Sequence, residues 1–174
     1  MNIDQIRQKM AYDPERRPSL KERVALWVGH LSKDYPIALT LTLKQVVTEL
    51  RPNGTVMYRI KRDDCQRIAK RFIKKLNREA FGNSAERHNL GLKYLVSVEG
   101  DGIGKNLHLH LAIGSIPSHI KFNQMDRLIR NAKSRCEGID EQHKTTFAGD
   151  SGWAEYICKE LSSGNTDKFL WDLA

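Results

Sequence analysis

The chain has 174 residues and a mass of 20.0 kDa, a length that suits one domain with a hydrophobic core. Hydrophobic residues make up 40% and charged residues 29%, which is typical of a globular protein and excludes fibrous and disordered classes. No apolar run approaches the roughly 20 residues of a membrane-spanning helix, so we expect neither a signal peptide nor a membrane partner. The three cysteines are far apart, so we expect reduced thiols, no zinc finger and a cytoplasmic location.

Basic residues outnumber acidic ones, and the excess is concentrated in one short stretch. Lysine and arginine total 29 against 21 aspartate and glutamate, a net charge of +8. Residues 61–78 alone contain 8 basic and 2 acidic side chains. Such a cluster is typical either of a nucleic-acid contact or of a solvated helix face, and charge alone does not separate the two.

The part of the chain before this stretch predicts a helix, a strand and a hairpin. Ser19 and Glu22 have the spacing of a capping box and predict a helix that continues to about Asp34. Residues 37–44 alternate strictly between apolar and other side chains, which is the period of a strand. A Pro-Asn-Gly turn joins two further β-prone runs as a predicted hairpin, residues 45–50 and 55–60.

The basic stretch predicts an amphipathic helix. We expect Asp63 or Asp64 to cap it, and its apolar side chains from Cys65 to Ala80 recur at steps of three and four. The basic side chains fall largely on the remaining surface, where they are candidate contacts to DNA. These candidates are Arg67, Lys70, Arg71, Lys74, Lys75 and Arg78.

The remaining elements predict the fold class. Two alternating segments, 92–99 and 107–113, predict strands, and amphipathic helices are predicted from Asn123 and over 152–161. Strands and helices in this order indicate an α+β fold, with helices over a mostly antiparallel sheet.

Each of the three strongest predicted strands has one apolar face and one face that carries polar side chains. The polar side chains are Thr40 and Thr42, Ser97 and Glu99, and His108 and His110. Because residues i and i+2 project to the same side, the two histidines lie together. A hairpin register with Glu99 opposite His108 brings the carboxylate to both imidazoles, whereas a slip of one residue turns Glu99 into the core. These three side chains suit Mg²⁺ or Mn²⁺, and Zn²⁺ is also compatible. The other four histidines have no comparable spacing, and we interpret them as structural or surface residues.

Tyr156 and Lys159 lie three residues apart and outside the apolar stripe of the last predicted helix, so they are neighbours on its surface. A tyrosine hydroxyl ordinarily loses its proton near pH ~10, and an adjacent ammonium group favours the phenolate or holds a phosphate oxygen. The pair is a candidate nucleophile with its activating cation. The alternative is a boundary tyrosine beside a lysine that extends into solvent.

Together these elements resemble the HUH single-strand endonucleases, and among them the single-tyrosine rolling-circle replication initiators. Three motifs match in the order of the family: the strand ALTLT at 38–42, His-Leu-His at 108–110 and Tyr-Ile-Cys-Lys at 156–159. Glu99 matches the upstream acidic ligand of many members. The resemblance implies a ferredoxin-like, RRM-like sheet core of the HUH type. We therefore expect one HUH domain over 1–174, with a helical extension over 1–36, a catalytic core over 37–161 and no helicase domain.

The resemblance also implies a reaction and its residues. A divalent ion, Mn²⁺ or Mg²⁺, would be held by Glu99, His108 and His110. Tyr156 would attack the scissile phosphate and leave a 5′-phosphotyrosine link and a free 3′-hydroxyl, while Lys159 would activate the tyrosine or bind a phosphate oxygen.

The partner implied is a single-stranded replication origin, which can include a hairpin, of a plasmid or phage-like replicon. Thr40, Thr42 and the basic helix are the expected DNA contacts, and a host helicase and polymerase are further partners. Two other functions stay open. A single-tyrosine transposase of the same superfamily commonly takes a metal ligand from a Gln after the tyrosine, and no Gln follows Tyr156 here. A DNA-binding module without chemistry would keep all its activity when Tyr156 is replaced by Phe.

Overall fold

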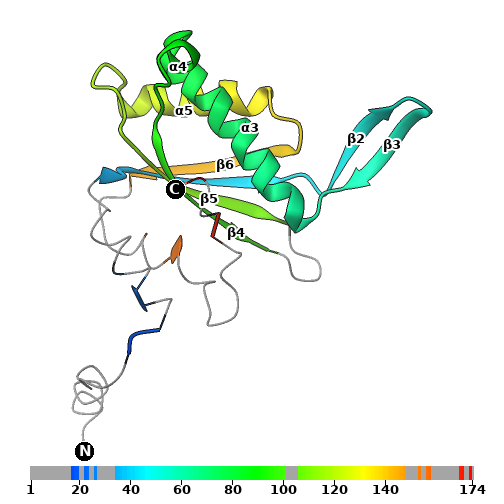
Figure 1. The fold of residues 1–174 in the computed structure, drawn as a ribbon, viewed down its shortest axis with the longest axis horizontal. Coiled ribbons are helices and arrows are strands. Elements are labelled where there is room, and N and C mark those ends of the chain that lie inside the picture. Colours follow the sequence, from blue (N-terminus) through cyan, green and yellow to red (C-terminus); the bar gives the residue numbers. More distant parts are fainter. Residues whose placement is uncertain are drawn as a thin grey trace, which may run out of the picture.

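The computed structural model describes residues 17–19, 22, 23, 26, 34–100, 106–147, 153, 156, 157, 169, 170 and 173 (Figure 1). The elements in chain order are β1 (Ile37–Leu43), β2 (Val46–Arg51), β3 (Gly54–Arg59), α3 (Arg62–Phe81), α4 (Ser84–Arg87), β4 (Lys93–Glu99), β5 (His108–Gly114), α5 (Phe122–Ser134) and β6 (Ile139–Phe147). Within this described part, no helix is long and apolar enough to cross a membrane.

Four strands form one antiparallel sheet in the order β4-β5-β1-β6. The connection from β1 to β4 contains α3 and passes β5, and the connection from β5 to β6 contains α5 and passes β1. This succession and strand order form the ferredoxin-like split βαβ arrangement. Strands β2 and β3 form a separate two-stranded hairpin, inserted between β1 and α3. The α+β class with a mostly antiparallel sheet is therefore confirmed.

Both long helices cover the same face of the sheet (Figure 1). The sheet places alternate apolar side chains under them, of which Leu39, Val96 and Leu111 are completely buried. Phe72 of α3 and Ile129 of α5 pack against this layer from the helix side and are also completely buried. Full burial of such a side chain contributes about 1.5–3 kcal/mol, so this layer is the main source of stability.

The five predicted strands are confirmed to within one residue at each end. The structure contains one further strand, β6, that was not predicted. The sequence of β6 is IDEQHKTTF, which lacks the alternation of the other strands because its side chains under α5 include His143 and Thr145. The strand also has a register shift opposite Leu41–Leu43. A bulge of this kind breaks the two-residue period on which the prediction depends.

The helix starts differ from prediction by one to three residues. Helix α3 begins at Arg62 with Lys61 as N-cap, so the predicted cap at Asp63 or Asp64 is wrong. Asp64 instead occupies the third helical position, where its carboxylate accepts a hydrogen bond of 2.9 Å from the Lys61 amide. Helix α5 begins one residue before the predicted Asn123.

Two predicted helices lie largely outside the described residues. The capping box that opens the first is confirmed: the Ser19 amide donates to Glu22 (2.7 Å), and the Glu22 amide donates to the Ser19 hydroxyl (3.2 Å). Of the last helix, Trp153, Tyr156 and Ile157 are described, and all three are helical. Farther along, Phe169 bridges to Ser97 on the outer edge of β4.

Candidate active site

The face of the sheet opposite α3 and α5 carries two rows of polar side chains. In one row, Ser97 on β4, His110 on β5 and Thr40 on β1 are direct neighbours across the strands. In the next row, the neighbours are Glu99, His108 and Thr42. Glu99 pairs with His108, so the register predicted from the alternation of the two strands is confirmed.

His110 lies at the centre of this face and is only 3% exposed. Its Nε2 is 2.7 Å from Oε2 of Glu99, and its Nδ1 is 3.0 Å from the Thr40 hydroxyl. A threonine hydroxyl can donate or accept, so Thr40 can pair with Nδ1 whether or not that nitrogen carries the proton. Thr40 therefore orients the ring while Nε2 stays directed at the carboxylate.

A glycine closes the strand pair on which Glu99 and His108 lie. Gly100 follows Glu99 directly and has φ +96°, a conformation that side chains disfavour. A Cβ atom at this position would lie 2.1 Å from the carbonyl oxygen of Asn106. The Asn106 side chain in turn accepts a hydrogen bond of 2.6 Å from Gln45, which ties the turn to the segment after β1. Only glycine lets the two strands close at this distance.

The tyrosine motif meets the histidines on this face. The Tyr156 ring lies edge-on to the His110 ring, with centroids 4.9 Å apart and an interplanar angle of 88°. Trp153 stacks on Tyr156 with centroids 5.1 Å apart and an angle of 13°. Tyr156 is 38% exposed, so a ligand in solvent can reach it.

Two residues near this site were missed by sequence reasoning. Trp153 lies three positions before Tyr156, a helical spacing that would have indicated their stacking. Lys144 lies on β6 opposite Thr40, so it extends the row of His110 with an exposed cation. Nothing in the sequence pointed to Lys144, because β6 itself was not predicted.

The other candidate site residues are distributed as follows. Lys159 lies outside the described residues. Thr40 is engaged with His110, and Thr42 is buried. The basic side chains of α3 lie on a helix that covers the opposite face of the sheet, so the fold does not bring them to the histidines.

Glu99, His108 and His110 were tested as ligands of a divalent ion. Among the described residues, no group of three His, Cys, Asp or Glu side chains forms a ready-made metal site. Two of the three donors do converge, since Glu99 Oε2 and His110 Nε2 are 2.7 Å apart. The ring of His108 lies parallel to that of His110 at a centroid distance of 6.3 Å, on the same face. Imidazole nitrogens and a carboxylate suit Mn²⁺, Mg²⁺ or Zn²⁺, so the donor set fits such an ion.

His143 is engaged in a separate network under α5. Its Nε2 is 2.9 Å from Asp126, and its Nδ1 is 3.1 Å from the Lys133 ammonium group. Since the ammonium group can only donate, Nδ1 accepts and the Nε2 proton points to the carboxylate. Desolvation lowers the pKa of Lys133. These contacts join β6 to α5, so of the two roles predicted for this histidine, structural or surface, the structural one holds.

Comparisons of the chain with protein-family models, with curated proteins and with solved structures found no match.

Proposed function

We propose that this chain is a metal-dependent HUH endonuclease that nicks and rejoins single-stranded DNA and initiates rolling-circle replication of a plasmid or phage-like replicon in the cytoplasm. One observation carries the proposal: the Tyr156 ring lies 4.9 Å from the His110 ring. The two residues are 46 positions apart in the sequence, and neither contributes to the hydrophobic core under the helices. A solvent-exposed nucleophile beside a histidine–carboxylate pair is the arrangement that this reaction needs.

Glu99, His108 and His110 would hold the divalent ion, which supplies Lewis-acid polarisation of the scissile phosphate. Thr40 acts behind these ligands, because its hydroxyl is 3.0 Å from Nδ1 of His110 and restrains the ring. Burial of His110 removes competing water from that nitrogen. The chain thus orients its donors before any substrate arrives.

In the proposed reaction, the hydroxyl of Tyr156 attacks the scissile phosphorus. An O–P bond forms to the tyrosine, the bond from phosphorus to O3′ breaks, and its electron pair leaves with O3′. The tyrosine proton passes to solvent or a nearby base, and O3′ takes up a proton to become the free 3′-hydroxyl. The product keeps a phosphodiester-like bond at Tyr156, so the reverse attack by a 3′-hydroxyl rejoins the strand.

Three further side chains are assigned supporting roles. Trp153 restrains the plane of the Tyr156 ring by stacking and offers a face on which a base of the single strand can stack. Lys159 activates Tyr156 or binds a phosphate oxygen. Lys144, exposed in the row of His110, is a second cation for the DNA backbone on this face.

The test is covalent capture of DNA. The full chain is incubated with Mn²⁺ and a fluorescent library of single-stranded origins, and adducts that survive denaturation are counted. We expect an adduct with the wild type, none with Tyr156→Phe, and none after EDTA treatment or with His108→Ala/His110→Ala. Tyr58→Phe is the matched control on a short single strand, because it removes a tyrosine hydroxyl that bonds Asp64 of α3, away from the polar face.

Binding must be measured in parallel, since Phe keeps the ring and its packing. Tyr156→Phe should therefore bind single-stranded DNA and Mn²⁺ as the wild type does. Peptide mapping should locate the 5′ end of the DNA on Tyr156. An adduct formed by the Tyr156→Phe variant, or mapped to another tyrosine, would show that the mechanism is wrong.

A further inference from the structure

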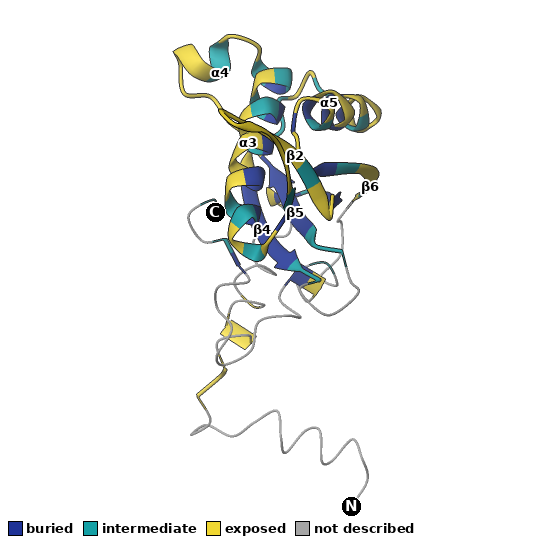
Figure 2. Ribbon diagram, turned by 90° about the vertical axis from the view of Figure 1, so that its right-hand side faces the viewer, coloured by how far each residue is buried: buried dark blue, intermediate teal, exposed yellow. Residues whose placement is uncertain are grey.

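The basic helix and the candidate active site lie on opposite faces of the sheet. Helix α3 packs its apolar side on the face that carries Leu39 and Leu111 (Figures 1 and 2). Glu99 and His110 project from the other face, by the alternation of β4 and β5. Since a helix with its side chains is about 10 Å across, the outer side of α3 and the site are separated by a helix and a sheet. A strand held at Tyr156 therefore leaves the cations of α3 available to a different segment of nucleic acid.

The outer side of α3 has the chemistry of a phosphate-binding surface. Every exposed residue of this helix is charged, and five of the six are basic: Asp63, Arg67, Lys70, Arg71, Lys74 and Arg78. Arg67 pairs with Asp64, and Lys74 pairs with Glu86. Within the described part of the chain, Lys70, Arg71 and Arg78 have no ion-pair partner.

This surface also lacks the means to read single strands. Proteins bind single strands through aromatic side chains on which bases stack, in addition to cations. Both aromatic residues of α3, Phe72 and Phe81, are buried or half-buried, so none of the exposed positions offers a stacking platform. The stacked pair of Trp153 and Tyr156 belongs to the other face. Cations without a stacking platform favour contact with phosphates, as on a duplex, over the capture of unstacked bases.

The hairpin β2–β3 is a second exposed element: every residue of its two strands except Val47 and Tyr58 is exposed, and Val47 packs against the core. Its two six-residue strands are each about 20 Å long, and the hairpin projects away from the four-stranded sheet (Figures 1 and 2). Leu50 and Met57 are 84% and 76% exposed. A two-stranded ribbon buries little surface and is marginally stable alone, so it needs an anchor to stay extended.

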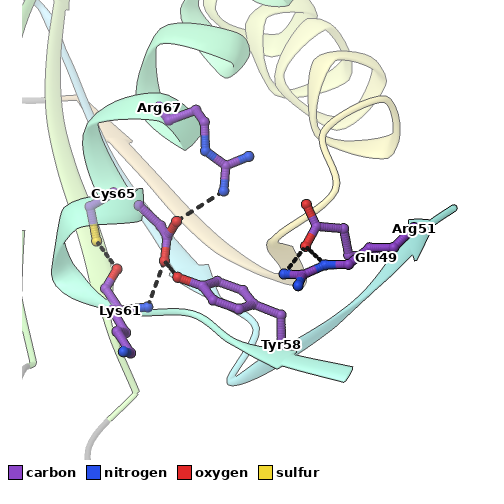
Figure 3. Close-up of polar contacts among 7 residues, drawn as sticks. Glu49, Arg51, Tyr58, Lys61, Cys65 and Arg67 are labelled. Atoms are coloured by element: carbon purple, nitrogen blue, oxygen red, sulfur yellow. Dashed lines mark hydrogen bonds and ion pairs between the residues drawn. The ribbon is translucent and has the colours of Figure 1, made fainter. Parts of the chain in front are cut away.

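The hairpin is connected both to the basic helix α3 and to the strand β1 of the candidate active site. At α3, the Asp64 carboxylate accepts hydrogen bonds from the Tyr58 hydroxyl (2.7 Å) and from the Arg67 guanidinium (2.9 Å). Figure 3 labels these two donors, Tyr58 on the hairpin and Arg67 on α3. At the site, β1 carries Thr42 opposite His108, and the hairpin begins only four residues later at Val46. The hairpin is thus held in one direction, beside the basic helix and next to the end of the polar face.

From these observations we infer that the outer side of α3 and the hairpin β2–β3 form a binding surface for double-stranded DNA, separate from the single-strand site. The major groove of B-DNA is about 12 Å wide and admits a two-stranded ribbon. With the ribbon in the groove, Lys70, Arg71 and Arg78 contact phosphates of the flanking backbone. In the proposed function, on which this assignment rests, the duplex is the stem that flanks the single-stranded nick site.

The test measures binding to a 20-base-pair duplex and to a single-stranded oligonucleotide by fluorescence anisotropy at several salt concentrations. The surface variant is Lys70→Gln/Arg71→Gln, and the matched control is Lys93→Gln/Arg127→Gln, which removes two charges that are also exposed but lie on other elements. Each lost phosphate contact flattens the slope of log affinity against log salt by about 0.9 on a duplex. We expect the surface variant to flatten the duplex slope by about 1.8, and the control to leave it unchanged.

Two readouts separate this inference from the proposed function. The surface variant should form the covalent adduct with a short single strand at the wild-type rate. Duplex binding should persist in Tyr156→Phe, even if no adduct ever forms with any variant. An equal loss of slope in the surface and control variants would overturn the duplex surface.

The hairpin is tested with Leu50→Ser/Met57→Ser, which changes only exposed side chains. We expect its duplex affinity to fall severalfold while its affinity for the single strand stays unchanged. A changed oligomeric mass with unchanged duplex affinity would mean that the apolar tip binds a second copy of the chain, and the assignment to DNA would be wrong.

Discussion

Replacing Gly100 by Ala tests how the strand pair of the candidate site is closed. The residue has φ +96°, and holding a side chain in such a conformation costs about 1–3 kcal/mol. The added Cβ would also lie 2.1 Å from the Asn106 carbonyl oxygen. Because non-bonded atoms are at their optimum near 3.5–4 Å, the carbonyl would have to retreat by about 1.5 Å. Crowding of this kind typically costs a further 1–3 kcal/mol, roughly.

Gly54→Ala is the matched control for this substitution. Gly54 has φ +120°, and a Cβ there would meet nothing within 4 Å, so this variant carries the conformational cost without the clash. The difference between the two free energies of unfolding, measured by urea denaturation, isolates the clash. We expect Gly100→Ala to be the less stable variant by about 1–3 kcal/mol.

The displacement also reaches the site, because the same Cβ would lie 3.4 Å from Nδ1 of His108 and Gly100 directly follows Glu99. A shift of about 1 Å in a catalytic group can cost roughly 10²-fold in rate. Adduct formation on a short single strand should therefore fall about 100-fold in Gly100→Ala and stay unchanged in Gly54→Ala. Equal stability and equal rates in the two variants would refute the closure described for this turn.

Two further predictions concern single hydrogen bonds. Thr40→Val removes the hydrogen-bond partner of His110 Nδ1 and should weaken Mn²⁺ binding by about 10–100-fold in calorimetry. Thr40→Ser keeps the hydroxyl and should bind Mn²⁺ with the wild-type affinity, and equal affinities in the two variants would show that Thr40 does not orient the ring. For Asp64, desolvation opposes ionisation, but hydrogen bonds from Lys61, Tyr58 and Arg67 outweigh it and lower the pKa of this carboxyl. Because the folded-state pKa is the lower one, the carboxylate stabilises the fold above the ordinary aspartate range, and this stabilisation is lost as pH falls below about 4. In urea denaturation, Asp64→Asn should therefore cost about 1–2 kcal/mol at pH 7 and progressively less as the pH falls below about 4, and a cost independent of pH would contradict this account.

Much of the candidate site could be predicted from local pattern. Strict alternation in β4 and β5 places Glu99, His108 and His110 on the polar face, because a strand has a period of two residues. Only one parity of pairing keeps both apolar faces in the core, so the register followed from the same pattern. The pairing of Glu99 with His108 was therefore predictable without knowledge of the rest of the fold.

The position of the tyrosine relative to this face was not predictable in the same way. Helical spacing indicated that Tyr156 lies off the apolar stripe, but spacing does not say which part of the sheet a helix lies against. That choice is made by contacts between distant segments, such as the edge-on contact of Tyr156 with His110. Only the resemblance of motifs led us to expect the two residues in one site.

The sequence by itself determined the class of the fold, the strands β1, β4 and β5 and the polarity of their faces, since these depend on side chains a few residues apart. The tertiary structure alone decided that β6 completes the sheet and brings Lys144 beside Thr40, because a bulged strand with a histidine under a helix has no clear period. It also decided that the basic face of α3 lies behind the sheet rather than beside the histidines. The amphipathic pattern of a helix predicts that one side of it packs on apolar surface. Which face of the sheet the helix covers depends on the path of the chain between the strands.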